Sequence, residues 1–278
     1  VVETGWIAVG KTQTPEVGSS ADLLKIRQKG GIGSFFEPEK IETIVSDGNN
    51  ILPNISLVGL LIYFENVKSL ELNYYPHISE DFLCRIGEVK PELETLGIGS
   101  CSGYIELLRL IPKYLTNLKR IYFTKAIISG DGFKDLFKGA FINQLGLSDC
   151  SVELPDDLTL FGRVISLTLN HILTLKEKDF TDLFAACHSL LYLQLLNVRH
   201  FSLKTHALPK NLMSLIIDAA ELNACVTSDL TIPQIEELKE LKLLTVSGIP
   251  SEKLKSVLAG YIKSGKIQVK FSNARSAS

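Results

Sequence analysis

Most patterns that mark a metal centre or a membrane protein are missing from this chain of 278 residues. Its five cysteines include no C-x-x-C pair, so the spacing typical of a zinc site is absent. An odd number of cysteines without a disulfide framework predicts a reducing, intracellular setting, cytoplasmic in the first instance. No apolar run reaches the roughly 18–20 residues that a membrane-spanning helix needs. The formal net charge of −2 gives no reason to expect binding to nucleic acid or to a membrane.

Recognisable catalytic constellations are also missing. The five histidines have no ligand-rich neighbours, and His200 and His206, although close in sequence, stand in an irregular segment. No G-x-S-x-G pattern supports a serine nucleophile. We therefore predict no metal, no cofactor and no catalysis.

One nucleotide-binding pattern is present near the start of the chain. Residues 5–12 read G-W-I-A-V-G-K-T and match G-x-x-x-x-G-K-[ST] at every fixed position. A working phosphate-binding loop follows a buried strand and leads directly into a helix. Here the eight residues after Thr12 include Pro15 and Gly18, which are poor in a helix interior. We expect the match to be coincidental, and nucleotide binding remains an alternative.

A repeated pattern covers most of the chain. Eight segments read apolar-x-x-apolar-x-apolar-x-x-(apolar or Cys), for example L93-ETLGIGSC and V164-ISLTLNHI. They start at residues 67, 93, 118, 142, 164, 190, 212 and 241, so successive copies lie 22–29 residues apart. This resembles the leucine-rich repeat, with its period of 20–29 residues and its core L-x-x-L-x-L-x-x-N/C-x-L.

The ninth position of two repeats holds Cys101 and Cys150, which looks like the cysteine-containing subclass found in ubiquitin-ligase adaptors. We expect both side chains to pack in the core. The resemblance implies an α/β solenoid of eight to ten repeats, with a curved parallel sheet on the concave side and helices and turns on the convex side.

The spacing predicts the local structure of each repeat. Alternating apolar residues such as Leu96 and Ile98 place one face of a short strand against the core. Amphipathic segments of helix length follow several strands, beginning near residues 79, 104, 132, 177 and 251, with Ser79 and Ser251 as N-caps. The short returns at 151–163 and 199–211 predict turns or a 3₁₀ turn.

The ends of the chain depart from the period. We predict an N-terminal cap segment over residues 1–40, a repeat domain over 41–271 and a tail over 272–278. Residues 41–50 fit a degenerate first repeat, and residues 267–271 fit a closing strand. Within the cap, residues 21–28 predict a short helix that begins after Ser20 and stops at Gly30.

The resemblance implies a protein partner on the concave face, because outward strand positions there are free of core packing. Tyr122 should stand exposed between Gly97 and Gly146 on the neighbouring strands, with Arg120 and Lys125 on the same strand. Tyrosine and arginine are favoured in binding hot spots. Farther along, the face turns apolar at Leu196, Met213, Ile216, Ala219 and Leu243. The predicted partner-binding residues are Tyr74, Arg120, Tyr122, Lys125, Asp149, His171 and Tyr192.

These expectations favour a non-catalytic interaction or adaptor module with a protein partner of unknown identity. Within that class, a ubiquitin-ligase adaptor and a bacterial effector acting inside a host cell are both open. A regulator of the Ran GTPase-activator type shares the repeat class, and Arg120 would be its residue to test. The sequence leaves the oligomeric state open.

Overall fold

The structure is a computed structural model that describes the backbone of residues 4–9, 23–29, 41–47, 54–73, 78–100 and 104–272. Side chains are described for residues 41–45, 57–73, 78–100 and 106–272. The chain forms two compact units, Val1–Ile142 and Asn143–Ser278. The three predicted segments, 1–40, 41–271 and 272–278, stay a prediction.

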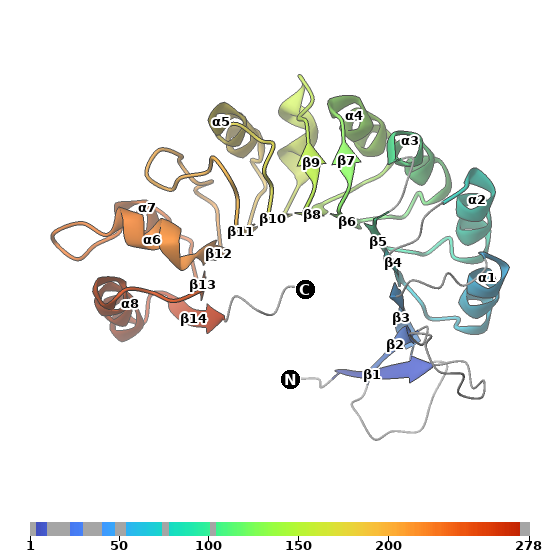
Figure 1. Cartoon of the computed structure of the whole chain (residues 1–278), viewed down its shortest axis with the longest axis horizontal. Helices are drawn as coiled ribbons and strands as arrows, with labels where there is room; N and C mark the ends of the chain where they lie inside the picture. The colour runs from blue at the N-terminus through green and yellow to red at the C-terminus, as the bar shows by residue number, and fades with distance from the viewer. Residues whose placement is uncertain are drawn as a thin grey trace, which may run out of the picture. The chain divides into compact units, whose positions relative to one another are not determined.

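The first unit contains a sheet whose strands follow chain order. Strands β3, β4, β5 and β6 pair in parallel, each with the next, while β1 and β2 extend the sheet in antiparallel fashion. Helices lie along one face of this sheet (Figure 1). The elements are β1 (Thr4–Val9), β2 (Leu23–Lys29), β3 (Ile41–Asp47), α1 (Asn54–Tyr63), β4 (Ser69–Asn73), α2 (Glu80–Val89), β5 (Thr95–Gly99), α3 (Tyr104–Tyr114), β6 (Arg120–Thr124), β7 (Ile127–Ile128) and α4 (Gly130–Gly139).

The second unit repeats this plan. Strands β8, β10, β11, β12, β13 and β14 pair in parallel, each with the next in that order. The elements are β8 (Gln144–Ser148), β9 (Ser151–Val152), a 3₁₀ helix (Leu158–Arg163), β10 (Ser166–Asn170), α5 (Glu177–Ala186), β11 (Tyr192–Leu196), β12 (Ser214–Asp218), α6 (Ala219–Cys225), α7 (Pro233–Glu236), β13 (Leu243–Ser247), α8 (Glu252–Ser264) and β14 (Gln268–Ser272).

The predicted repeat is therefore confirmed strand by strand. In all eight copies the strand occupies the third to seventh positions of the pattern, as in Thr95–Gly99 and Ser166–Asn170. The strand predicted at residues 267–271 is β14, and the degenerate first repeat contributes β3. The predicted helices correspond to α2, α3, α4, α5 and α8, and the return at 151–163 forms the 3₁₀ helix.

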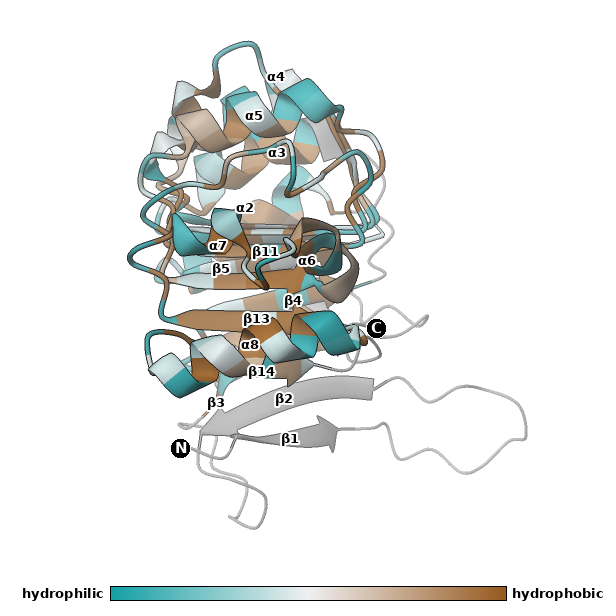
Figure 2. Ribbon diagram, turned by 90° about the vertical axis from the view of Figure 1, so that its left-hand side faces the viewer, coloured by the Kyte–Doolittle hydropathy of each residue, from teal (hydrophilic) through white to brown (hydrophobic). Residues whose placement is uncertain are grey.

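Helix caps form where the sequence predicts them. The Ser79 Oγ accepts a hydrogen bond from the Phe82 N–H, and the Ser251 Oγ accepts one from the Leu254 N–H. Each cap satisfies a backbone donor that the first turn of a helix leaves unpaired. The ribbon of α8 alternates between hydrophilic and hydrophobic residues (Figure 2), as expected of a helix with one face on the core.

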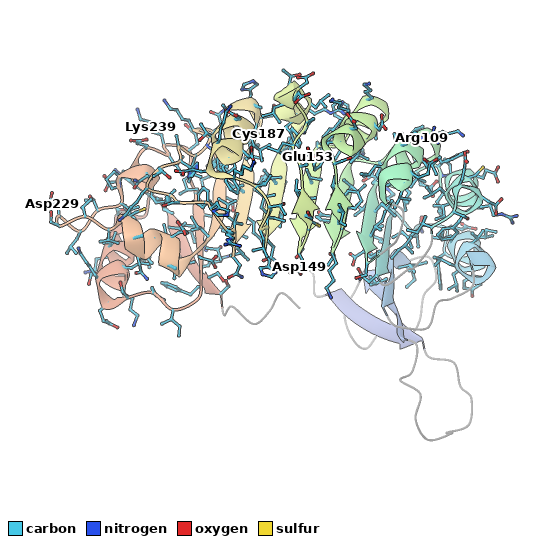
Figure 3. All side chains as sticks on the ribbon, turned by 45° about the horizontal axis from the view of Figure 1, so that its top comes forward. Arg109, Asp149, Glu153, Cys187, Asp229 and Lys239 are labelled. Carbon is cyan, nitrogen blue, oxygen red and sulfur yellow. The ribbon has the colours of Figure 1, made fainter. Side chains whose placement is uncertain are left out.

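The core of each unit lies between the sheet and its helices. Inward strand residues such as Leu70, Leu96, Leu167 and Leu215 are at most 1% exposed. Cys150 is buried, as predicted, whereas Cys101 lies outside the described residues. Figure 3 shows side chains filling the space between strands and helices, while Arg109 and Lys239 point outward. Burial of one such leucine contributes roughly 1.5–3 kcal/mol.

The predicted helix at residues 21–28 is wrong. Residues 23–29 form β2, which pairs with both β1 and β3. The segment L-K-I-R-Q-K also alternates apolar and polar residues at its start, a pattern that suits a strand. Hydrogen bonding to two neighbouring strands outweighs the helix preference of leucine, lysine and glutamine here.

The strand β1 also bears on the phosphate-binding pattern. Residues 5–9 of G-W-I-A-V-G-K-T lie in β1, in register with β2 from Gly5 opposite Gln28 to Val9 opposite Leu24. In a phosphate-binding loop this stretch curls around the phosphates with its N–H groups turned inward. A strand paired along its length has a different geometry, which agrees with a coincidental match.

Candidate functional site

The concave face is defined here as the sheet face formed by the third, fifth and seventh repeat positions, opposite the helices. In β10 these positions hold Ser166, Thr168 and Asn170, while Leu167 and Leu169 point into the core. Across β8, β10, β11, β12 and β13 only one of these positions is charged, Asp218. From β8 to β13 the concave face of the second unit is therefore polar but almost free of charge, and β14 adds Lys270 in register with Thr245.

A shallow hollow lies on this face around Tyr192. Its volume is about 310 Å³, and residues of β8, β10, β11 and β12 line it. Tyr192 is 46% exposed and stands in register between Ser166 and Ser214. Because serine side chains are short, both flanks of the tyrosine ring remain accessible. Among the predicted site residues of this unit, Tyr192 is the one that lies in a strand.

In the first unit, Tyr122 and Arg120 lie on the outward face of β6. Tyr122 is 38% exposed and stands in register with Gly97, as predicted. The space above Gly97 is not empty, because an added Cβ there would lie 3.1 Å from the Glu71 Cγ. Burial raises the pKa of Tyr122, the nearby Arg120 lowers it, and Glu71 raises it. The Arg120 guanidinium lies 3.5 Å from the Glu94 carboxylate.

Three predicted residues lie just beyond the strands. Lys125, Asp149 and His171 occupy the eighth repeat position, with φ angles of 55°, 54° and 53°. A left-handed turn thus follows each of β6, β8 and β10, so the expectation that Lys125 lies on the same strand as Arg120 is wrong. Asp149 and His171 form a hydrogen bond through Oδ1 and Nδ1. Tyr74 lies outside the described residues.

The predicted apolar stretch is only partly on the concave face. Leu196, Met213, Ile216 and Leu243 are half-buried, and Ile216 lines the hollow around Tyr192. Ala219 is buried, because it is the first residue of α6 and not part of a strand face.

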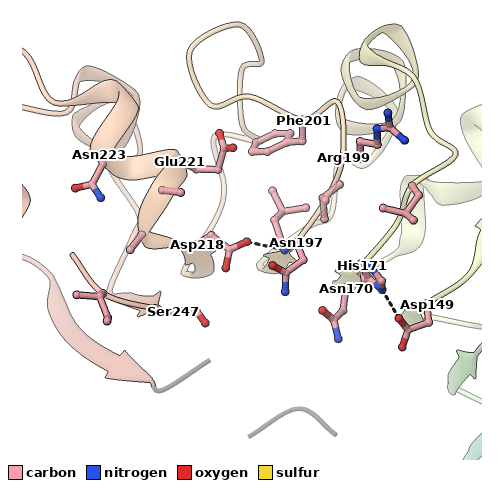
Figure 4. Close-up of a pocket in the computed structure, with 17 residues that line it drawn as sticks. Asp149, Asn170, His171, Asn197, Arg199, Phe201, Asp218, Glu221, Asn223 and Ser247 are labelled. Carbon is pink, nitrogen blue, oxygen red and sulfur yellow. Dashed lines mark hydrogen bonds and ion pairs between the residues drawn. The ribbon is translucent and has the colours of Figure 1, made fainter. Parts of the chain in front are cut away.

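A larger groove, which the sequence reasoning missed, follows the ends of the strands in the second unit. Its volume is about 850 Å³, and turns after β8, β10, β11, β12 and β13 line it (Figure 4). Two of its carboxylates, Asp218 and Glu221, are three residues apart where β12 runs directly into α6. The sequence signal is the unusual D-A-A-E of residues 218–221, which places Ala219 at the eighth repeat position, where the other turns carry a polar residue or glycine.

Neither a metal cluster nor a membrane span is found among the described residues. No group of three or more His, Cys, Asp or Glu side chains there could hold a metal ion. Within the same ranges, no helix combines the length and the apolar character needed to cross a bilayer.

Comparison with known proteins gives the fold. No family model matches the chain, and no curated protein matches it. The solved structure of the TLR13–ssRNA13 complex is similar, with a TM-score of 0.51 and 16% identity over 84% of this chain and 36% of that one. The yeast Rad7–Elc1 complex has a TM-score of 0.47 and 12% identity, over 79% of this chain and 65% of that one. The internalin InlF of Listeria monocytogenes has a TM-score of 0.37 and 16% identity, over 78% of this chain and 59% of that one.

The chain has a leucine-rich repeat fold of the α/β type, as its own repeat geometry and the similarity to the TLR13 structure show. It spans between about a third and two thirds of the length of each of the three. At this level of identity the likeness concerns the fold alone.

Proposed function

We propose that the chain is a non-catalytic protein-binding module that uses the concave face of its second unit, with Tyr192 at the centre. The observation that carries this proposal is the exposure of Tyr192 at the start of β11, a strand that is paired on both sides. The sheet gains no core packing from this ring. An exposed aromatic side chain on such a surface is available to a partner.

The physical chemistry around Tyr192 suits a protein partner. Serine, threonine and glutamine side chains offer hydrogen bonds at Ser166, Thr168 and Gln194, and Ile216 adds apolar surface. Because no charged group lines this hollow, a partner could cover it without burying an unpaired charge. A tyrosine ring that becomes buried between partners is a frequent hot spot.

The partner's chemical class needs a direct test. The TLR13 structure named above is a complex with single-stranded RNA. Its likeness to this chain gives no support for excluding nucleic acid, although the near absence of lysine and arginine on this concave face favours protein over RNA. The test therefore compares samples with and without ribonuclease.

The narrower alternatives have no structural observation in their favour. Arg120, the residue that a GTPase activator would use, lies within β6 beside Glu94 and not on a mobile loop. The adaptor role in ubiquitin ligation and the effector role in a host cell stay hypotheses. We also propose an intracellular location, which rests on the cysteine pattern of the sequence.

Affinity capture from cell lysate, followed by mass spectrometry, tests the proposal. The parent chain is compared with Tyr192→Ala and with the control Tyr63→Ala. Tyr63 is 61% exposed and lies on α1 in the other unit, so both variants remove an exposed tyrosine ring. Circular dichroism melts check that all three proteins fold.

We expect the parent and Tyr63→Ala to capture the same protein and Tyr192→Ala to lose it, with no effect of ribonuclease. Equal capture by all three proteins would place the site elsewhere. Loss of the captured protein on ribonuclease treatment would make RNA the primary ligand and contradict the proposal.

A further inference from the structure

We infer that the groove at the strand ends of the second unit takes a basic side chain, arginine or lysine, from a peptide segment of the bound protein. The inference rests on the proposed protein-binding function and adds a second site with a stated chemistry. The groove is distinct from the hollow around Tyr192, because the two share no lining residue.

Each of the three carboxylates of this groove is held by a hydrogen bond, two of them from backbone N–H groups. One oxygen of Asp218 accepts a hydrogen bond from the Asn197 N–H, and one oxygen of Glu221 accepts a bond of 3.1 Å from the Leu203 N–H. Asp149 is held by His171. In each carboxylate the other oxygen has no partner among the described residues. These oxygens are ordered acceptors that a cationic donor could meet without reorganisation.

The reason for the Asp218 arrangement lies in the fold. Elsewhere the residue in the left-handed turn donates its N–H to the last carbonyl of the next strand, as from Asp149 to Asn170 and from His171 to Leu196. After β11 this acceptor is the Asp218 side chain, because α6 begins directly after Asp218. The Asp218 carboxylate thus accepts the hydrogen bond that a strand carbonyl accepts in the other turns, and it still faces the groove (Figure 4).

A serine hydroxyl that opens into the same groove offers a further polar contact to a ligand. Ser247 is 6% exposed, lines the groove at the end of β13, and its Oγ has no hydrogen-bond partner within the described ranges. The rest of the serine is buried, so this hydroxyl is held at the groove wall and can donate or accept one hydrogen bond there. A donor group of a ligand that enters beside Asp218 would satisfy it.

The charge of the groove and the apolar residues at its rim indicate what kind of peptide would fit. Arg199 is the one lysine or arginine among the lining residues, and its guanidinium points away from Asp218 (Figure 4). Three carboxylates thus outnumber one guanidinium. At the rim, Leu173 is 46% exposed and Ile249 is 90% exposed. A basic residue with apolar neighbours in the peptide matches this pattern.

Phage-displayed random dodecapeptides selected on the parent chain test the inference, with enriched peptides then synthesised and measured by fluorescence polarisation. The variants are Asp218→Asn, which keeps an oxygen acceptor for Asn197 but removes the charge, and Tyr192→Ala. The control is Asp229→Asn, because Asp229 lies on an exposed loop outside the groove (Figure 3).

We expect enriched peptides that carry arginine or lysine beside apolar residues. Their affinity should fall about tenfold in Asp218→Asn and in peptides with arginine replaced by glutamine, and should change less than twofold in Asp229→Asn. Enriched peptides without a basic residue, or no enrichment at all, would overturn the inference.

The two proposals fail in different ways. Peptides that bind Asp218→Asn normally but lose affinity for Tyr192→Ala would refute the groove as a binding site and support the site at Tyr192. Peptides that require Asp218 and ignore Tyr192 would support the groove, while affinity capture decides the concave site separately.

Discussion

The substitution Gly87→Ala tests how closely α2 and α3 approach each other. A Cβ at Gly87 would lie 2.3 Å from the Tyr114 carbonyl oxygen, whereas ordinary contacts begin near 3.4 Å. The obstacle is backbone at the end of α3, so it cannot rotate away as a side chain could. Gly59 in α1 provides the control within the same unit, because a Cβ there meets nothing within 4 Å.

The two substitutions should change stability in opposite directions. Replacing glycine by alanine inside a helix stabilises by about 0.8–1 kcal/mol. Forcing an extra carbon into a filled site costs about 1–3 kcal/mol, and the backbone contact places Gly87 toward the upper end. We therefore expect Gly87→Ala to lose about 2 kcal/mol and Gly59→Ala to gain about 1 kcal/mol.

Thermal melts followed by circular dichroism at about 222 nm give the comparison. At roughly 2–4 °C per kcal/mol, the Tm should fall by about 4–8 °C for Gly87→Ala and rise by about 2–4 °C for Gly59→Ala. A Gly87→Ala protein as stable as the parent would show that the close approach of α2 to α3 is not present in solution.

Three further predictions concern individual side chains. His206 is buried, and its ring nitrogens lie 2.8 Å from the Ser202 carbonyl oxygen and 2.9 Å from the Glu177 carbonyl oxygen. His206→Ala should therefore lower the free energy of unfolding by about 2 kcal/mol or more and speed hydrogen exchange across residues 199–211. Unchanged exchange in this segment would contradict the prediction. Burial raises the pKa of Cys187 to about 12, so roughly one Cys187 side chain in ten thousand is a thiolate at pH 8. Iodoacetamide should therefore label the half-buried Cys84 well before the buried Cys187, and peptide mass spectrometry can follow both reactions. Hydrogen bonds from Lys113 and Tyr114 lower the pKa of Glu80. Their contribution to stability is therefore present above the pKa of the unfolded state and is lost as the pH falls through the pKa of the folded state. The Tm difference between the parent and Glu80→Gln should shrink below about pH 4.5, and a difference that stays constant with pH would refute the pairing.

The strands could be predicted from the sequence because each repeat carries its own signal. Leu96 and Ile98, or Leu167 and Leu169, mark one face of a strand, and eight recurrences exclude chance. The left-handed turns after β6, β8 and β10 were not predicted, because Lys125, Asp149 and His171 have little in common except position. Their placement depends on the hydrogen bonds to the next strand, which residue type alone does not reveal.

Two kinds of element escaped prediction for physical reasons. The helix α1 is apolar on nearly every side, so its sequence lacks the one-sided pattern that identifies α2 and α8. The strand β2 depends on pairing with β1 and β3, which is tertiary and not local information. The groove beside Asp218 was missed because it is assembled from five separate turns.

Photo-crosslinking tests the central claim, that the concave face of the second unit binds a protein. Benzoylphenylalanine replaces Tyr192 in one protein and Tyr63 in another, and each is irradiated in cell lysate with and without ribonuclease. We expect one protein adduct, insensitive to ribonuclease, from position 192 and none from position 63. The same adducts from both positions, or adducts with RNA alone, would contradict it.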